Sequence, residues 1–281
     1  MKKLNLCVVI LLLAAITFKT NAQTPRIPEA SSTQTIIQDF GLGKITITYS
    51  RPNVKGRVIF GGINPYGQVW RTGANAATTI NFTENVVMEG HSVPAGTYSL
   101  FTVPDKDQWI VILNKVVKQW GAYSYKQSED FLRFTEKPVI LDEKRETFTI
   151  QFANATTQSN DLHLVWDHTA ISIHMQTDDD AKITANIEEL MKGDRKPYYF
   201  NAIQYYYENN KDMKKALGWA LEAEKVDPGT WYKLWEARIR LKMGDKAAAI
   251  AAAQEGIKMA QANKDDEYVR LNQAVIDQAG S

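Results

Sequence analysis

The sequence has a single cysteine, and this scarcity excludes sites and cross-links that depend on thiols. The single cysteine, Cys7, lies in an apolar run from Leu4 to Ile16. That run is too short to span a membrane, and it stands between two lysines and Thr20-Asn21-Ala22, which is typical of a secretory signal peptide covering residues 1–22. We therefore expect cleavage after Ala22 and a periplasmic or secreted protein without disulfides, zinc thiolates or a cysteine nucleophile.

A large excess of charge of one sign is also missing. Removing the three lysines of the leader from the 33 basic residues leaves 30, against 32 acidic residues. A slightly acidic chain does not favour a nucleic-acid partner or a membrane-surface role, and no stable membrane insertion is expected. The roughly 259 residues that remain are enough for about two domains.

The common catalytic motifs are absent as well. There is no Gly-x-Ser-x-Gly elbow, no His-Glu-x-x-His helix and no lysine-terminated phosphate loop. The paired carboxylates of a glycosidase cannot be placed, because the separations of the acidic residues are unknown. The sequence therefore predicts no cofactor and no metal, and it leaves open whether a reaction is catalysed.

Alternating apolar residues predict a β domain over residues 33–176, preceded by a linker at 23–32. Turn residues interrupt the alternation every ten or so positions. Two hairpins are predicted, at 86–93 and at 96–113, and the second is apolar on both faces and belongs at the centre of a sheet. Eight or nine short antiparallel strands favour a β-sandwich with a jelly-roll-like arrangement. The stretch 114–138 is predicted to be irregular, either packing on the sheet or covering a ligand.

Three of the four histidines crowd one short stretch of this domain. A two-residue turn at Asp167-His168 would fold the stretch into a hairpin. Its core face would carry Leu162, Leu164, Trp166, Ile171, Ile173 and Met175. Its other face would carry Asp161, His163, Ser172 and His174. A third well-placed ligand is lacking, so this face is interpreted as a solvated edge and not as a metal site.

The pattern changes after residue 176, where apolar residues recur every three to four positions and predict six helices over 177–281. A period of 34 residues aligns Ala216 with Ile250 and Trp219 with Ala253, which resembles tetratricopeptide repeats. The predicted fold class is α+β, a β-sandwich followed by a helical repeat-like domain. Such helix pairs bind a protein partner or support a neighbouring domain.

The segment from Tyr49 to Asn75 concentrates positive charge in a chain that is otherwise balanced. No Asp or Glu occurs between Asp39 and Glu84. Five glycines and two prolines divide the segment into turns, so that side chains and free backbone N–H groups can converge. Its guanidinium groups suit carboxylate, sulfate or phosphate. The structural alternative is that each arginine pairs with a carboxylate or lies over an aromatic ring, as Arg71 could over Trp70.

Indole, amide and hydroxyl groups extend this predicted site beyond the charges. The two tryptophans Trp70 and Trp120 would form an apolar wall, and polar groups enter the strand that follows the segment. The predicted ligand-binding residues are Arg51, Lys55, Arg57, Trp70, Arg71, Asn75, Thr79 and Trp120.

Several short motifs in this region occur together in one known family. They are Tyr49-Ser50-Arg51-Pro52, Lys55-Gly56-Arg57, Pro65-Tyr66-Gly67, Trp70-Arg71-Thr72-Gly73-Ala74-Asn75, Ala95-Gly96-Thr97-Tyr98-Ser99-Leu100 and Trp120-Gly121. In this order they resemble the bacterial domain of unknown function 2911 over residues 33–176. The resemblance implies an exported β domain, sometimes followed by a repeat-like helical tail, and it transfers no catalytic role.

Three functions are compatible with these observations. The first is binding of a small anionic or carbohydrate-like ligand in an arginine-rich pocket of the β domain. The second is a scaffold in which residues 177–281 hold a protein partner. The third is a hydrolase whose pocket cations stabilise a developing oxyanion, which requires a nucleophile or base near Arg71.

Overall fold

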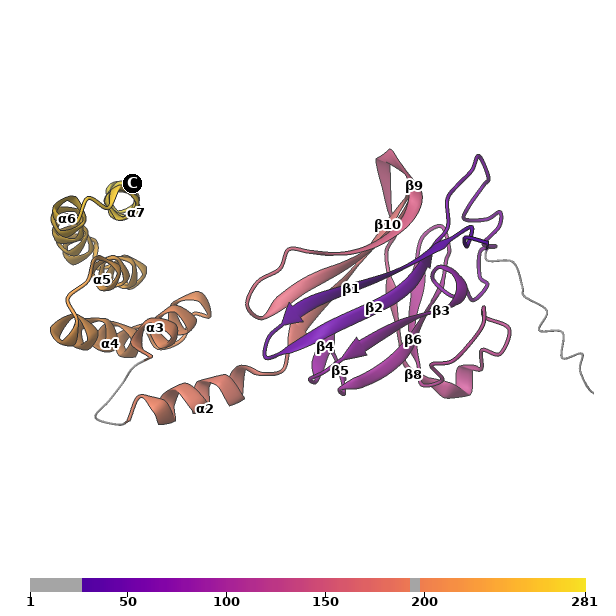
Figure 1. The fold of residues 1–281 in the computed structure, drawn as a ribbon, viewed down its shortest axis with the longest axis horizontal. Helices are drawn as coiled ribbons and strands as arrows, with labels where there is room; N and C mark the ends of the chain where they lie inside the picture. Colours follow the sequence, from indigo (N-terminus) through magenta and orange to yellow (C-terminus); the bar gives the residue numbers. More distant parts are fainter. Residues whose placement is uncertain (1–26, 193–197) are drawn as a thin grey trace, which may run out of the picture. The chain divides into compact units, whose positions relative to one another are not determined.

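The computed structural model describes residues 27–192 and 198–281, and it shows an α+β protein (Figure 1). The chain divides after Asp178 into two compact units. We call them the β domain and the helical domain and describe each by itself. The predicted signal peptide and residues 23–26 of the predicted linker lie outside the described residues.

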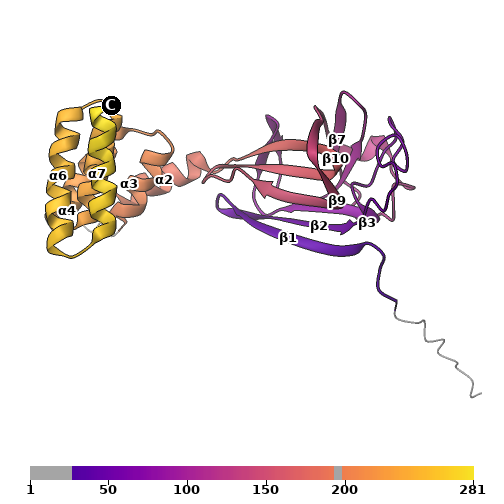
Figure 2. The ribbon, with the colours of Figure 1, turned by 90° about the horizontal axis from the view of Figure 1, so that it is seen from above.

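Two antiparallel sheets form the β domain, and Figure 2 shows them as separate layers. The six-stranded sheet has the order β1 (Ser32–Phe40), β2 (Gly43–Arg51), β3 (Ala74–Phe82), β6 (Gly96–Val103), β7 (Trp109–Asn114) and β8 (Asp130–Glu136). The four-stranded sheet has the order β5 (His91–Val93), β4 (Val86–Met88), β10 (Ser159–Thr177) and β9 (Val139–Ala153). The predicted hairpins β4–β5 and β6–β7 are confirmed, and β6 and β7 lie inside their sheet.

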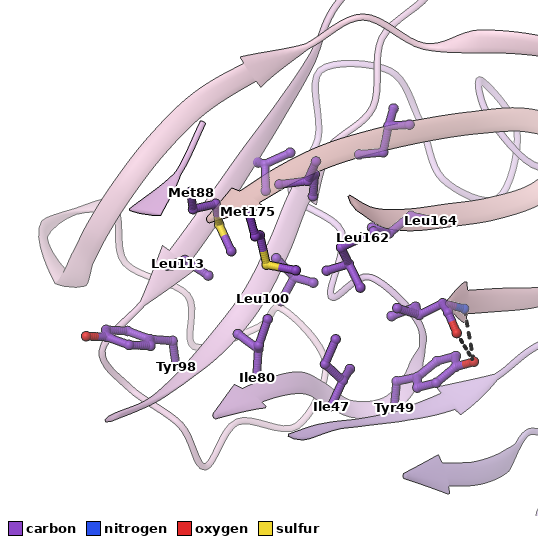
Figure 3. Packing of buried hydrophobic residues seen from close by; sticks show 14 of the residues in the cluster. Ile47, Tyr49, Ile80, Met88, Tyr98, Leu100, Leu113, Leu162, Leu164 and Met175 are labelled. Carbon is purple, nitrogen blue, oxygen red and sulfur yellow. Dashed lines mark hydrogen bonds between the residues drawn. The ribbon is translucent and has the colours of Figure 1, made fainter. Parts of the chain in front are cut away.

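The core of this domain lies between the facing sides of the two sheets. Alternate residues of β2 and β3, such as Ile47 and Ile80, are fully buried against Leu162 and Met175 of β10 (Figure 3). Tyr49 adds a polar link, because its hydroxyl donates to Ile150 O at 3.2 Å and accepts from Ile150 N at 3.0 Å. The strand period of two then directs the intervening side chains of each sheet outward.

One predicted hairpin is wrong. Residues 159–177 form the single strand β10, which pairs with β9 and β4 and does not fold back at Asp167-His168. The register shifts on both sides of Asp167, whose φ is 54°, and the shift exchanges the inward and outward positions. For that reason the predicted core face is correct although the turn is absent. All six of its apolar residues are buried in the core.

The prediction that 114–138 is irregular is also wrong in its last part. Asp130–Glu136 forms β8, which pairs with β7 along the edge of the six-stranded sheet. A short 3-10 helix at Gln127–Glu129 precedes it. The residues before that helix stay irregular and cross the outer face of the sheet, where Ala122 and Tyr125 pack on a small cluster around Phe101 and Ile112.

Six helices were predicted for the helical domain and all are present. They are α2 (Asp180–Leu190), α3 (Tyr199–Glu208), α4 (Met213–Val226), α5 (Thr230–Lys242), α6 (Lys246–Ala262) and α7 (Asp266–Gly280). Aspartates start three of them: the side chains of Asp212, Asp245 and Asp265 accept hydrogen bonds from the first backbone N–H groups of α4, α6 and α7. The tetratricopeptide-like character of these helices stays a prediction.

Candidate functional site

Arg51, at the end of β2, joins the two sheets. Its Nε donates to Phe148 O at 3.2 Å and its Nη2 donates to Thr149 Oγ1 at 2.9 Å, both on β9. A guanidinium group at the end of a strand can reach across to oxygens that no neighbouring strand satisfies. Arg51 therefore makes contacts within the protein, and its predicted contact with a ligand stays a prediction.

The turn that follows holds its cations near the surface. Arg57 is exposed and donates from Nε to Val54 O at 3.0 Å and from Nη2 to Asn53 O. The side chain of Lys55 is exposed, and its backbone N donates to Glu146 Oε1 at 2.8 Å. This hydrogen bond lowers the pKa of the Glu146 carboxyl below its usual value. The Arg57 side chain and the Lys55 backbone N–H therefore stabilise this turn, and the second of these bonds ties it to β9.

Trp70 is part of the core and not the wall of an open pocket. It is 5% exposed, and its ring lies 5.1 Å from that of Phe148 and 5.6 Å from that of Trp166. Its Nε1 donates to Gly73 O at 3.0 Å. The Nε atom of the adjacent Arg71 is buried and has no hydrogen-bond partner among the described residues.

A tight turn at residues 72–75 returns the chain to the sheet. Thr72 and Asn75 have φ angles of 53° and 58°, and Gly73 has a φ of 155°. A Cβ on Gly73 would lie 2.9 Å from Ser50 O, so glycine allows the close approach to β2. The turn places Asn75 Nδ2 at 3.4 Å from Ser50 Oγ and 3.3 Å from Ser31 O.

Beside this turn, the outer face of the six-stranded sheet is hollowed by a cavity of about 430 Å³, which we call the threonine cavity. Strands β1, β2 and β3 form its floor, and residues 117–120 form its wall. Its lining residues are Thr33, Thr48, Tyr49, Ser50, Ala76, Ala77, Thr79, Val117, Lys118, Gln119 and Trp120. Four of them carry aliphatic hydroxyl groups, and Lys118 is the one charged residue in this lining.

The floor belongs to a row of polar residues that crosses five strands. Directly paired neighbours place Thr35, Thr48, Thr79, Ser99 and Asn114 side by side. The row follows from the alternation of β2 and β3, in which Ile47 and Ile80 point inward and their neighbours outward. Thr48 and Thr79 face the cavity, whereas Ser99 and Asn114 lie under the irregular segment.

The covered half of the row fixes the wall. Ser99 Oγ lies within hydrogen-bond distance of Val116 O at 2.9 Å and of Val117 O at 3.2 Å. Asn114 Oδ1 accepts from Val116 N at 3.0 Å and from Gln119 Nε2 at 3.1 Å. Backbone bonds from Ala77 N to Gln119 O, and from Gly121 N to Asn75 O, close the wall onto β3.

Two side chains of the wall stand out. Trp120 keeps 66% of its surface exposed at the rim of the cavity, which is unusual for an indole. Gln119 is 6% exposed, and its Oε1 is buried without a partner among the described residues. Main-chain hydrogen bonds between this part of the wall and β3 hold both residues in place.

Of the predicted site residues, the structure brings Thr79 and Trp120 together in this cavity. Arg51, Lys55, Arg57, Trp70, Arg71 and Asn75 do not line it. Sequence reasoning missed Thr33, Thr48, Ser50 and Gln119. The signal for the first three was present, since the outward positions of the predicted strands are occupied by Thr and Ser in place of charged residues.

Two of the histidines on β10 make hydrogen bonds within the protein. His174 Nδ1 lies 2.7 Å from Asp161 Oδ1, and His168 Nδ1 lies 2.9 Å from Leu141 O. Within the described ranges, His, Cys, Asp and Glu residues form no group of three or more that could hold a metal ion. Among the same residues, no helix is long and apolar enough to cross a membrane.

Two carboxyl groups meet where β8 ends. Glu89 lies in the β4–β5 turn with a φ of 47°, and its carboxylate accepts from His174 N. Glu136 is the last residue of β8. Burial, followed by the charge and the hydrogen bond of Glu89, raises the pKa of Glu136 to about 7. The pair makes this junction sensitive to pH.

Comparison with known proteins gives one match. A family model described as "Protein of unknown function (DUF2911)" matches residues 31–175, which include the whole threonine cavity. Neither the curated proteins nor the solved structures that were searched contain a match.

Proposed function

The chain belongs to the DUF2911 family, and on that premise we propose that its β domain binds a small carbohydrate-like ligand in the threonine cavity. The observation that carries the proposal is the combination of a floor of hydroxyl groups with the exposed indole of Trp120 at the rim. The proposal moves the predicted binding site from the arginines of residues 49–75 to the outer face of the sheet.

The chemistry of the lining matches that of a sugar. A hydroxyl group donates one hydrogen bond and accepts two, so the 2.9 Å bond between Thr48 Oγ1 and Thr35 Oγ1 leaves further positions on Thr48. Sugar hydroxyls have the same dual character, while the C–H groups of a sugar ring form an apolar face that packs on an aromatic ring. The volume of about 430 Å³ lies in the range of small-ligand sites.

The charge of the lining supports one of the two ligand classes expected from the sequence over the other. Arg51 and Arg57 donate to oxygens of the protein, and neither lines the cavity. Lys118 is left as the cation of the lining, a single charge without a bidentate fork. A neutral sugar is therefore favoured, and a sugar acid would gain from one ion pair at Lys118.

Calorimetric titration of the full chain with neutral sugars and sugar acids tests this proposal. Trp120→Ala should weaken binding about tenfold or more, because a stacked aromatic ring is removed. Tyr123→Ala is the matched control, since Tyr123 lies on the same segment, is 85% exposed and does not line the cavity. Equal affinity of Trp120→Ala and the unaltered chain, or no binding by any sugar tested, would overturn it.

A second candidate is a protein partner for the helical domain. Three of its aromatic side chains have large exposed fractions. They are Tyr198, just before α3, at 49%, Phe200 of α3 at 41% and Trp231 of α5 at 36%. We propose that these rings contact a partner, as the resemblance to tetratricopeptide repeats suggests. A photo-crosslinking residue at Phe200 should link to another protein in the producing cell, and one at the exposed Gln273 of α7 should not. Equal linking at both positions would contradict this.

Export also remains a proposal from the sequence. Mass spectrometry of the purified protein from cell fractions should find a mature chain that starts at Gln23 in the exported fraction. A chain that retains Met1 in the cytoplasm would exclude it.

A further inference from the structure

A second cavity lies on the outer face of the four-stranded sheet. Its volume is about 350 Å³, and we call it the β9 cavity. Phe148, Ile150, Leu162 and Leu164 of β9 and β10 point into the core. The cavity is lined by the alternate residues of these strands, including Thr149, Gln151, His163 and Val165, so it opens on the opposite side.

The hollow arises where β9 leaves its partner. Between the pairs Val165↔Thr149 and Thr169↔Ile140, β10 advances four residues while β9 advances nine. The excess residues of β9 turn to another partner, because Val54 N donates to Glu146 O at 2.7 Å and Phe148 N donates to Pro52 O at 2.8 Å. The paired Asp167 and Arg145 divide the excess into two register shifts, which separate the side chains that would otherwise fill the space between the strands.

The lining has an apolar part and a polar part that includes the cation Arg145. Val139, Leu141, Val165 and Ala170 supply aliphatic surface, and Val139 is 56% exposed. Arg145 and His163 supply the ionisable groups. The residues that line this cavity include no carboxylate. An occupant that covers the aliphatic surface and carries one negative charge fits both parts.

The acids near Arg145 leave it available to such a charge. Asp167 is its strand partner, but among the described residues the ion pair recorded for Arg145 is with Glu143. Glu143 Oε2 lies 3.4 Å from Arg145 Nη2, but the two side chains are 84% and 58% exposed, so this ion pair contributes little. Asp161, two residues before His163, is bound by His174 Nδ1 and by Asn154 Nδ2, each at 2.7 Å. Arg145 can therefore exchange an exposed partner for a carboxylate held in the cavity.

We propose that the β9 cavity binds a medium-chain aliphatic carboxylate, with its carboxylate on Arg145 and its chain against Val139, Leu141 and Val165. This site is independent of the threonine cavity, since the two cavities share no lining residue and lie on different sheets. Failure of sugar binding would leave it untouched.

Decanoate is the probe, titrated into the full chain below its micelle concentration, with decanol as the uncharged chain of equal length. Arg145→Gln should weaken decanoate binding about tenfold or more and leave decanol binding unchanged, because only the charged head contacts Arg145. Glu143→Gln should strengthen decanoate binding about twofold, because a competing carboxylate is removed. Lys144→Gln is the matched control, an exposed cation of the same strand that does not line the cavity.

Hydrogen exchange locates the binding. Decanoate should slow exchange in peptides that cover β9 and the middle of β10, and Val165→Ser should reduce that protection. Decanoate affinity that is equal in Arg145→Gln and the unaltered chain, or decanol that binds as tightly as decanoate, would overturn the proposal. Absence of decanoate binding at millimolar concentration would overturn it as well.

Discussion

The basic segment 49–75 and the threonine cavity belong to the same β domain, yet their polar groups are used differently. In the segment, the guanidinium groups of Arg51 and Arg57 donate to oxygens of the protein itself. In the cavity, Thr48 and Thr79 present hydroxyl groups to an open volume beside an exposed indole. The segment with an excess of positive charge holds the fold together, and a lining whose one charged residue is Lys118 forms the candidate site.

The difference has a simple physical origin. A guanidinium group carries five N–H donors, so at the end of a strand it can satisfy several carbonyl groups that no ladder reaches. A row of threonines on the outer face of a sheet meets no such demand, because the backbone of β2 and β3 is already paired. A run of basic residues in a sequence therefore indicates hydrogen-bond donors, but it does not indicate whether their acceptors belong to the protein or to a ligand.

Trp70→Ala should have the largest effect on stability. Deleting a buried tryptophan costs about 3–5 kcal/mol, and Trp70 contacts the rings of Trp166 and Phe148. Hydrogen exchange of peptides from β3 and β6 under increasing urea measures the loss. Trp120→Ala is the comparison and should change the same free energy by less than about 0.5 kcal/mol. Equal losses in both variants would remove the distinction between the segment and the cavity.

Arg51→Met should rank second. It keeps the aliphatic stem but removes the hydrogen bonds to Phe148 O and Thr149 Oγ1, at a cost of about 2 kcal/mol. Arg57→Met, on an exposed turn, should cost about 0.5 kcal/mol or less. The same exchange measurement on β2 and β9 separates them. If Arg51→Met lowers the sugar affinity under conditions in which the variant is fully folded, Arg51 is part of the binding site.

The carboxyl pair at the end of β8 should make stability depend on pH by a smaller amount. The pKa of Glu136 is raised from 4.5 to about 7, so the folded state holds this proton more tightly than the unfolded state. The stabilisation is complete below pH 4.5 and is lost as the pH rises from there to about 7. With screening of a partly exposed group, we expect about 1 kcal/mol.

Glu136→Gln should abolish this slope and make the protein more stable than the unaltered chain at pH 8. Carbon-13 NMR titration of the side-chain carboxyl gives the pKa directly, and urea midpoints at several pH values give the stability. Glu143→Gln, an exposed carboxylate on β9, is the control and should keep the slope. A stability that rises between pH 5 and 7 because of Glu136 would contradict the assignment.

Thr79→Val should have the smallest effect on stability and still change binding. Valine has the shape of threonine without its hydroxyl, so the free energy of unfolding should move by less than about 0.5 kcal/mol. The loss of one hydrogen bond should weaken sugar binding about fivefold. Thr46→Val, on the same face outside the cavity, should leave affinity unchanged. If the two substitutions change the sugar affinity equally, the hydroxyl groups of the cavity do not contact the ligand.

The fold was predictable where the alternation of apolar and polar residues determines which side chains are buried. Alternation in β2 fixed which side chains are buried, and the face of β10 that carries Leu162 and Met175 was correct. The partner of β10 was not predictable, because alternation gives sidedness and is silent about which strand lies alongside. A turn at Asp167 and a register shift at Asp167 exchange the faces in the same way, so the sequence pattern cannot separate them.

The candidate site was predictable only in part, for a related reason. Thr79 and Trp120 were chosen for their chemistry, and the structure places both in one cavity. The arginines were chosen for their charge, but the direction of a long flexible side chain depends on acceptors that are distant in sequence. For Arg51 these acceptors lie 97 and 98 residues away.

The wall of the threonine cavity has a kinetic consequence. It is held to the sheet by a few bonds at Ser99, Asn114 and the start of β3, and it is not a strand of either sheet. Releasing those bonds exposes little apolar surface compared with unfolding the domain, so the wall can open with a small fraction of the global free energy. Such an opening would widen the proposed binding site while the sheet beneath stays closed.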